Sequence, residues 1–196
     1  MKKLIWLTGG SGAGKSMAAE IIREMDIFVV DADAVSKQIL SKGSRAVEEV
    51  IHAFGGGILL PCGEINRKEL GKIVFSDSEK LAVLNNITHK YIKAQIDKEI
   101  EGAKGMVVVD APLPPKSFAN PDAVIAVVAD DEIRLKRIVL RDSISYENAK
   151  NRLKSQISQK EYIKGADYVI INEGTPNDLQ EEVKRVIKLI YSGDME

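Results

Sequence analysis

The stretch Gly9-Gly10-Ser11-Gly12-Ala13-Gly14-Lys15-Ser16 decides the fold of this chain. It matches the pattern G-x-x-x-x-G-K-[ST], whose glycines let backbone N–H groups curl around phosphate oxygens. The apolar run Leu4–Leu7 comes before it, and a helical pattern from about Lys15 to Met25 follows it. A junction of strand and helix is where a phosphate-binding loop belongs, because the helix N-terminus adds partial positive charge. The alternative interpretation is a glycine-rich turn that binds no nucleotide.

Four further short apolar runs predict the rest of a sheet. Continuous apolar runs of this length are typical of parallel strands that are buried on both faces. The runs are Ile27–Val30, Met106–Val109, Val124–Val128 and Tyr168–Ile171. Because helical patterns separate them, we expect an α/β protein with the three-layer, doubly wound P-loop fold and a five-stranded parallel sheet. The segment from Pro176 to Ile190 keeps helical spacing and predicts a closing helix.

The remaining residues predict two helical additions to a single domain. Residues 34–102 are too many for a loop, and their apolar positions have mainly helical spacing, so we expect a helical insertion. Residues 131–164 are charged and helical, and their place in the chain suits a lid. The core then comprises about residues 1–33, 103–130 and 165–196 of the 196.

The composition excludes several classes of protein. With 28 basic and 29 acidic residues, the chain has no global electrostatic footprint for a nucleic acid or an anionic membrane. Cys62 is the only cysteine, so neither an internal disulfide nor a cysteine-based zinc site can form, which fits a reducing compartment. No apolar stretch approaches the roughly 20 residues that cross a bilayer. We expect a cytoplasmic protein, a monomer or small homo-oligomer, whose partners are small molecules.

The loop predicts how ATP is held. Lys15 would reach the β and γ phosphates, and Ser16 is placed to bind the Mg²⁺ that accompanies ATP. The residues expected to contact ATP here are Gly10, Ser11, Gly12, Ala13, Gly14, Lys15, Ser16 and Met17. Such a loop also occurs in switches and motors, but we find neither an N-K-x-D nor a D-x-x-G motif, so the sequence does not support a GTPase.

Asp31 and Asp33 follow the second predicted strand directly. The carboxyl ends of parallel strands open on the ligand crevice, so these carboxylates are expected to face the phosphates. One could accept a proton from an attacking hydroxyl while the other positions magnesium or its waters. The alternative for Asp33 is an N-cap of the following helix.

A series of short motifs extends the pattern through nearly the whole chain. The series is Leu7–Ser16, Asp31-Ala32-Asp33, Phe54-Gly55, Ile65-Asn66-Arg67, Val74-Phe75, Leu84-Asn85, His89, Pro112-Leu113, Arg137, Arg141-Asp142, Gln156, Ala166-Asp167, Val169-Ile170 and Asn172. In order and spacing it resembles the dephospho-coenzyme A kinases, P-loop kinases of the nucleoside monophosphate kinase-like group. The resemblance implies phosphorylation of the ribose 3'-hydroxyl of dephospho-coenzyme A by ATP, which gives coenzyme A and ADP in the last step of coenzyme A synthesis.

The resemblance also implies roles for single residues. Asp33 would be the catalytic base, and Arg141 would clamp the transferring phosphates together with Lys15. Arg137, one helical turn before Arg141, would bind ATP, unless it is only part of a solvated helix face. Asn172 would lie near the adenine ring, with a strand-ending turn as the alternative.

The acceptor-binding residues that the resemblance implies lie mostly outside the loop. They are Asp31, Asp33, Arg67, His89, Pro112 and Leu113. Arg67 and His89 fall in the helical insertion, which grips the acceptor in the resembled family, and they would bind its anionic portion. A hydrogen-bonded structural role is the alternative for His89.

Four places depart from the family pattern. Met17 replaces a second hydroxyl residue after the loop, Lys90 replaces a proline, and Tyr162 replaces a basic residue that Lys160 or Lys164 could stand in for. Pro114-Pro115-Lys116 replaces a leucine-rich segment. Two other functions remain open: a nucleoside monophosphate-type kinase with another small-molecule acceptor, and a non-catalytic ATP-binding module. A hydroxyl acceptor needs a base, and Asp33 can supply one. This favours phosphorylation of dephospho-coenzyme A over the two alternatives.

Overall fold

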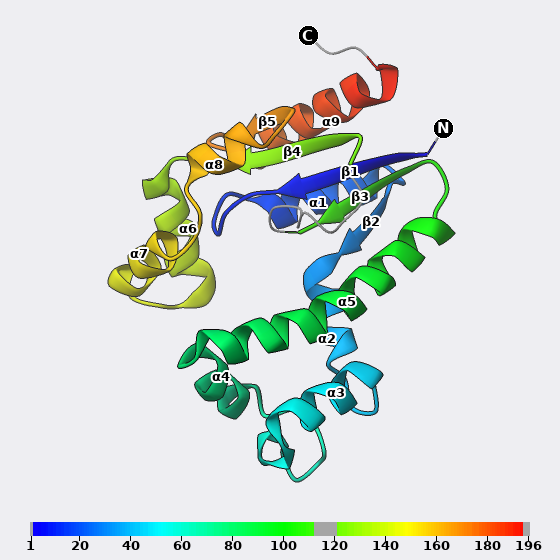
Figure 1. Cartoon of the computed structure of the whole chain (residues 1–196). Coiled ribbons are helices and arrows are strands. Elements are labelled where there is room, and N and C mark those ends of the chain that lie inside the picture. Colours follow the sequence, from blue (N-terminus) through cyan, green and yellow to red (C-terminus); the bar gives the residue numbers. More distant parts are fainter. Residues whose placement is uncertain (1, 112–120, 194–196) are drawn as a thin grey trace. The chain divides into compact units, whose positions relative to one another are not determined.

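The computed structural model describes residues 2–111 and 121–193. The chain divides into two compact units, which are described separately: Met1–Val30 with Ala103–Glu196, and Asp31–Gly102 (Figure 1). The expected contacts of Pro112 and Leu113, and the Pro114-Pro115-Lys116 segment, lie outside the described residues.

A five-stranded parallel sheet forms the centre of the first unit (Figure 1). The strands are β1 (Lys3–Thr8), β2 (Phe28–Asp31), β3 (Met106–Asp110), β4 (Ala123–Val128) and β5 (Tyr168–Ile171). Their order is β2-β3-β1-β4-β5, with β1 paired in parallel to both β3 and β4. The strand order therefore reverses beside β1, and open α/β sheets bind ligands at such a switch point. The predicted fold class is confirmed.

The central strands β1, β3 and β4 are largely buried on both faces because their side chains alternate between two apolar layers. At the edges of the sheet, Phe28 of β2 and Ile171 of β5 are exposed. Ile5 and Leu7 of β1 belong to the main core, with α1 (Lys15–Glu24) and α9 (Pro176–Ser192). These helices contribute Ala18, Ala19, Ile21, Ile22, Leu179, Val183, Val186, Ile187 and Ile190. On the alternate positions of β4, Ala126 and Val128 pack against Tyr162.

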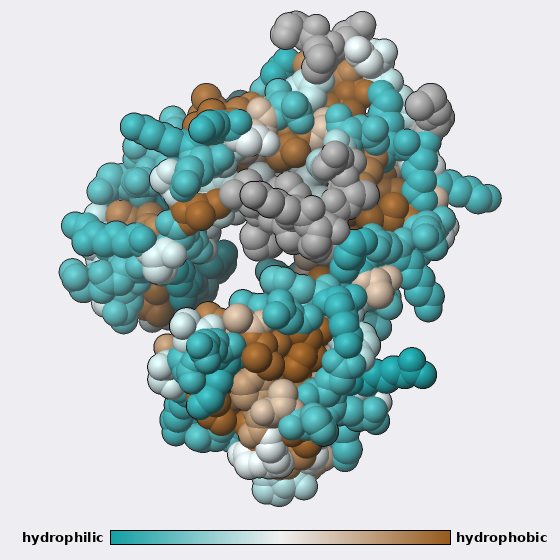
Figure 2. Space-filling view, in the orientation of Figure 1, coloured by the Kyte–Doolittle hydropathy of each residue, from teal (hydrophilic) through white to brown (hydrophobic). Residues whose placement is uncertain are grey.

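Three capped helices make up the segment that precedes β5. They are α6 (Asp131–Asp142), α7 (Tyr146–Lys154) and α8 (Gln159–Lys164). Asp130 caps α6, Ser145 caps α7, and Ser158 forms a capping box with Glu161. Leu135, Ile138 and Ala149 give α6 and α7 a small apolar cluster of their own. The surface of these two helices is largely hydrophilic (Figure 2), as their many charged residues predict.

The second unit is helical, as its apolar spacing predicts. Its elements are α2 (Ala32–Ile39), α3 (Arg45–Phe54), a 3-10 turn (Gly56–Ile58), α4 (Arg67–Phe75) and α5 (Ser78–Gly102). Its core joins Val47, Val50, Ile58, Ile65, Leu70 and Val74. Hydrophobic residues also gather on the face of this unit shown in Figure 2.

Two side chains of α5 tie it to α3. Lys90 Nζ lies 2.7 Å from the Glu49 carboxylate, and the Tyr91 hydroxyl donates a 2.6 Å hydrogen bond to the same group. Lys90, which departs from the family pattern, therefore joins two helices of the unit. In the described ranges no helix, including the 25-residue α5, is both long and apolar enough to span a membrane.

Candidate active site

The start of α1 is left open for an anion. Gly14 precedes the helix in the left-handed conformation, with φ 101°, and across the described residues no side chain caps it. By contrast, side chains accept hydrogen bonds from the first turns of α2, α3, α4, α6, α7 and α9. The first turn of α1 also holds no acidic residue. Its N–H groups and its dipole are therefore available to a phosphate.

Lys15, the first residue of α1, forms an ion pair with Asp110 at the end of β3. The two side chains are 19% and 8% exposed, so the pair is largely removed from water. The parallel register sets Asp110 opposite Leu7, two residues before the loop begins. Sequence reasoning missed Asp110, although a signal was present: an apolar strand that ends in aspartate is where P-loop proteins place a magnesium-binding carboxylate.

Three side chains donate to consecutive carbonyl groups of the loop. Arg134 Nε lies 2.9 Å from the carbonyl oxygen of Ser11, and Asn172 Nδ2 lies 2.8 Å from that of Ala13. Between them, Arg137 Nη1 makes a longer, 3.4 Å contact with the carbonyl oxygen of Gly12. Arg134 and Asn172 are only 4% and 6% exposed. The structure thus brings the predicted residues Arg137 and Asn172 to the loop, together with Arg134, which the sequence did not single out.

Ser11 is also held by Gln156, from the connection between α7 and α8. The Gln156 side-chain oxygen accepts the Ser11 N–H at 3.0 Å, and its amide nitrogen donates to the Ser11 hydroxyl at 2.7 Å. Arg134 in turn pairs with Asp131 at 2.8 Å, and Asp131 accepts a 3.0 Å hydrogen bond from Gln159. A polar network therefore joins the loop to the segment expected to act as a lid.

Arg141 lies in a different environment from Arg134 and Arg137. Its Nε and Nη2 donate to the Asp142 carboxylate at 2.7 and 3.0 Å, and Arg152 pairs with the same carboxylate. The hydrogen bond from Arg141 is the main reason that the pKa of Asp142 falls from 3.8 to about 2. The same hydrogen bond raises the pKa of Arg141, whose side chain is 59% exposed. Its expected contact with the transferring phosphates stays a prediction.

The two aspartates at the end of β2 and just beyond it have different surroundings. Asp31 is the N-cap of α2, since its Oδ1 accepts the N–H of Ala34 at 2.9 Å. Asp33 lies in the first turn of that helix with an exposed side chain. The alternative interpretation of Asp33 as the cap is therefore wrong, because the helix begins at Ala32, two residues earlier than that role needs.

Two further predicted acceptor residues, Arg67 and His89, also belong to the helical unit. Arg67 is the first residue of α4, directly after its cap Asn66, and its side chain is exposed. His89 is exposed on α5. Both therefore present their side chains to solvent from the surface of this unit.

The oxygen groups near the loop suit a magnesium ion that is bound jointly by the protein and by ATP, rather than a metal held by side chains alone. Among residues 2–111 and 121–193, no group of three or more His, Cys, Asp or Glu side chains could hold a metal ion. Ser16 offers a hydroxyl on the open turn of α1, and Asp110 offers a carboxylate. Mg²⁺ is usually bound by one or two carboxylates together with substrate phosphates and water. The residues present therefore suit Mg²⁺ that arrives with ATP.

The remaining departures have structural surroundings of their own. Tyr162 is 5% exposed and packs against β4, and its burial raises the pKa of its phenol. It fills the core where a basic residue would need a partner. Met17 is 47% exposed on α1.

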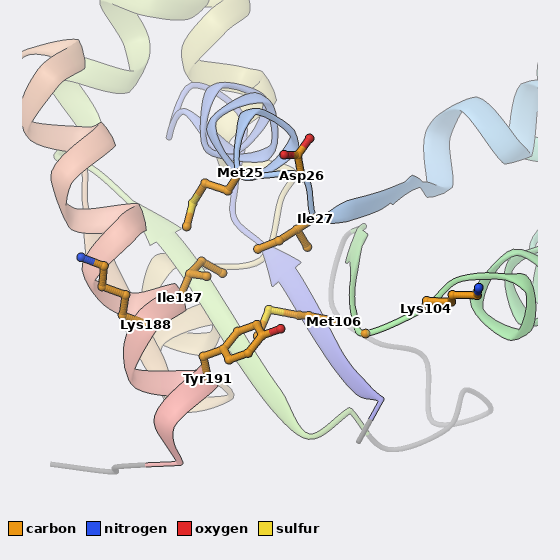
Figure 3. A pocket seen from close by; sticks show the side chains of 9 residues that line it. Met25, Asp26, Ile27, Lys104, Met106, Ile187, Lys188 and Tyr191 are labelled. Carbon is orange, nitrogen blue, oxygen red and sulfur yellow. The ribbon is translucent and has the colours of Figure 1, made fainter.

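A separate pocket of about 270 Å³ lies at the opposite ends of the strands (Figure 3). Ile27 and Met106 line it, and they stand before β2 and at the start of β3. In Figure 3 the side chains of Lys104 and Lys188 extend away from the apolar groups. The pocket lacks both the helix N-terminus and the converging polar groups of the loop, so it is not the phosphate site.

Comparison with known proteins identifies the family. The family model described as dephospho-CoA kinase matches residues 3–178. The chain belongs to this family. A dephospho-CoA kinase of Carboxydothermus hydrogenoformans is 37% identical over 191 residues, with 94% of this chain and 93% of that protein covered.

Two solved structures resemble the chain throughout its length. The dephospho-CoA kinase of Campylobacter jejuni is 33% identical, with a TM-score of 0.73 and complete coverage of both chains. The protein TT1252 of Thermus thermophilus is 27% identical, with a TM-score of 0.83 and coverage of 95% of this chain and 97% of that one. The predicted activity, phosphoryl transfer to dephospho-CoA in the final step of coenzyme A biosynthesis, is confirmed at the level of the family.

Proposed function

We propose that Asp33 is the base that takes the proton of the ribose 3'-hydroxyl of dephospho-CoA. The observation that carries this proposal is the difference between the two neighbouring aspartates. Asp31 is engaged as the cap of α2, whereas Asp33 extends from the first turn with its carboxylate exposed. A general base needs a carboxylate that can meet the substrate, and Asp33 meets that requirement.

The donor nucleotide is ATP, held at the loop before α1. The open N–H groups of the first turn and Lys15 would bind the β and γ phosphates. In the transfer, the 3'-oxygen bonds to the γ-phosphorus, the bond from that phosphorus to the β,γ-bridging oxygen breaks, and the hydroxyl proton passes to Asp33. ADP leaves with the bridging oxygen, and the products are ADP and coenzyme A.

Magnesium, when bound with ATP, would offset negative charge on the phosphates. Ser16 and Asp110 are the residues proposed to hold it. The pairing of Asp110 with Lys15 supports this assignment, because it holds the carboxylate beside the loop.

The other roles follow the family pattern and are part of the same proposal. Arg137 and Arg141 would bind the phosphates of ATP, and α6–α8 would act as the lid that excludes water. Arg67 and His89, both exposed, would bind the anionic portion of the acceptor. Asp31, Pro112 and Leu113 would contribute to the acceptor site.

The test is a kinetic comparison of Asp33→Asn with the native chain, using Mg²⁺-ATP and dephospho-CoA. We expect kcat to fall by about a hundredfold or more, because general-base catalysis typically contributes that much, while the affinity for ATP is unchanged. Glu48→Gln is a matched control, since Glu48 is also an exposed acid in the first turn of a helix. Native turnover in Asp33→Asn would refute the assignment of the base. Transfer by the native chain to nucleoside monophosphates instead of dephospho-CoA would refute the acceptor.

A further inference from the structure

The carbonyl groups of the phosphate-binding loop are bound from outside by side chains far away in the sequence. Arg134 Nε donates to the carbonyl oxygen of Ser11 at 2.9 Å, and Asn172 Nδ2 donates to that of Ala13 at 2.8 Å. Both side chains are almost completely buried. These contacts are therefore fixed parts of the fold rather than passing surface contacts.

The geometry of the peptide bond gives these contacts a consequence for the ligand side of the loop. In a trans peptide, the carbonyl of one residue and the N–H of the next lie in one plane and point in opposite directions. Fixing the carbonyl of Ser11 therefore fixes the direction of the N–H of Gly12. In the same way, fixing the carbonyl of Ala13 fixes the N–H of Gly14, the residue just before α1.

We propose that Arg134 and Asn172 are positioning residues that aim the N–H groups of Gly12 and Gly14 at the phosphates of the nucleotide. They act through the backbone and need not touch ATP themselves. This inference rests on the proposed binding of ATP at the loop, and it adds two residues to the way that site recognises phosphate.

Close packing supports the proposal. A Cβ at Gly12 would lie 2.6 Å from the carbonyl oxygen of Arg134, and a Cβ at Gly14 would collide with Asn172 Nδ2. Both glycines have positive φ angles, 78° and 101°. Glycine is therefore required at positions 12 and 14 on the outer side of the loop too, because Arg134 and Asn172 pack directly against it.

Arg134 is itself held in place. Its Nη1 lies 2.8 Å from Asp131 Oδ1, and the same oxygen accepts a hydrogen bond from Gln159 at 3.0 Å. Gln159 Oε1 accepts the N–H of Ala129, the residue after β4, at 3.1 Å. This chain of contacts anchors the guanidinium to the sheet, so that its Nε can orient the loop.

The experiment measures binding of two probes, Mg²⁺-ATP and inorganic tripolyphosphate, by calorimetry. Arg134→Met and Asn172→Leu remove the donors while keeping side chains of similar size. We expect each to weaken the binding of both probes by about tenfold or more. A misdirected N–H of the loop loses its hydrogen bond to a charged phosphate, and such bonds are worth that much. Arg134→Lys keeps a donor and a charge and should recover part of the affinity. The KM for dephospho-CoA should stay unchanged in every variant.

Tripolyphosphate has no adenine, so it distinguishes a side chain that positions the loop from one that contacts the adenine ring of ATP. If Asn172→Leu weakens ATP but not tripolyphosphate, the side chain recognises adenine and its positioning role is wrong. Arg185→Met, which removes an exposed pair with Glu182 on α9, is the matched control for the loss of an arginine. Melting curves check that each variant is folded at the temperature of the titration, and the two sites test the inference independently.

Two further results would overturn the proposal. Unchanged affinity for both probes in folded Arg134→Met and Asn172→Leu would show that the carbonyl contacts do not orient the loop. Equal losses in Arg134→Lys and Arg134→Met would show that a hydrogen-bond donor is not what matters. By contrast, failure of the native chain to bind either probe would refute the ATP site itself, which is a separate outcome.

Discussion

Replacing Asp110 by asparagine should change both the stability of the protein and its response to magnesium. The native carboxylate pairs with Lys15, and the two side chains are 8% and 19% exposed. Breaking a fully buried pair costs about 3–5 kcal/mol. Here Lys15 keeps some contact with water and the asparagine oxygen can still accept a hydrogen bond, so we expect a loss of about 1–3 kcal/mol. For a chain of this size each kcal/mol lowers the melting temperature by about 2–4 °C.

The sharper readout is the affinity for ATP with and without Mg²⁺. Without the metal, Asp110→Asn should bind ATP as well as the native chain or more tightly, because a negative charge beside the phosphates is gone and Lys15 is released. With Mg²⁺, the native chain should gain affinity, and the variant should lose most of that gain because the proposed metal ligand is missing. Titration calorimetry in EDTA and in Mg²⁺ measures both quantities.

The matched control is Asp122→Asn. Asp122 also accepts a hydrogen bond in the sheet, from the N–H of Leu4 at 2.7 Å, but it stands just before β4, away from the loop. This variant should keep the native response to magnesium. An equal magnesium effect in Asp110→Asn and the native chain would refute the reasoning, and so would a melting temperature that does not change.

Two further predictions concern α6–α8. Arg141 and Arg152 lower the pKa of Asp142 from 3.8 to about 2, so its contribution to stability is present above pH 3.8 and is lost as the pH falls through about 2. Asp142→Asn should therefore melt at a lower temperature than the native chain at pH 6. A difference in melting temperature that does not narrow in acid would contradict this. Tyr162 acts as a buried apolar group. Tyr162→Phe should therefore keep native activity and a free energy of unfolding within about 1 kcal/mol of the native value, while Tyr162→Ala should lose about 3 kcal/mol in urea unfolding. A large loss of ATP affinity in Tyr162→Phe would instead point to a functional hydroxyl.

Most of the fold could be predicted because local patterns determine it. The apolar runs of the strands, the helical spacing of Pro176–Ile190 and the glycine-rich loop all appear within a few consecutive residues. The five strands and α9 form where those patterns predict them, with ends that differ by one or two residues. The loop and Lys15 were found in the same way, because a phosphate-binding loop has its chemistry in one continuous stretch.

The partners of the loop could not be found in this way. Asp110 lies 95 residues from Lys15, and Asn172 lies 159 residues from Ala13. Arg134 looked like one basic residue among several on a charged helix, and only the packing of α6 buries it beside Ser11. The distinction between Asp31 as a cap and Asp33 as an exposed carboxylate also depended on where α2 begins.

The sequence by itself determined the parallel α/β fold, the place of the phosphate loop and the family to which the chain belongs. It could do so because apolar runs, helix spacing and the loop motif are properties of neighbouring residues, and because the order of short motifs along the chain carries the family pattern. Only the tertiary structure decided which side chains orient the loop and which carboxylate pairs with Lys15. Those contacts depend on strand order and helix packing, which bring together residues that no local pattern connects.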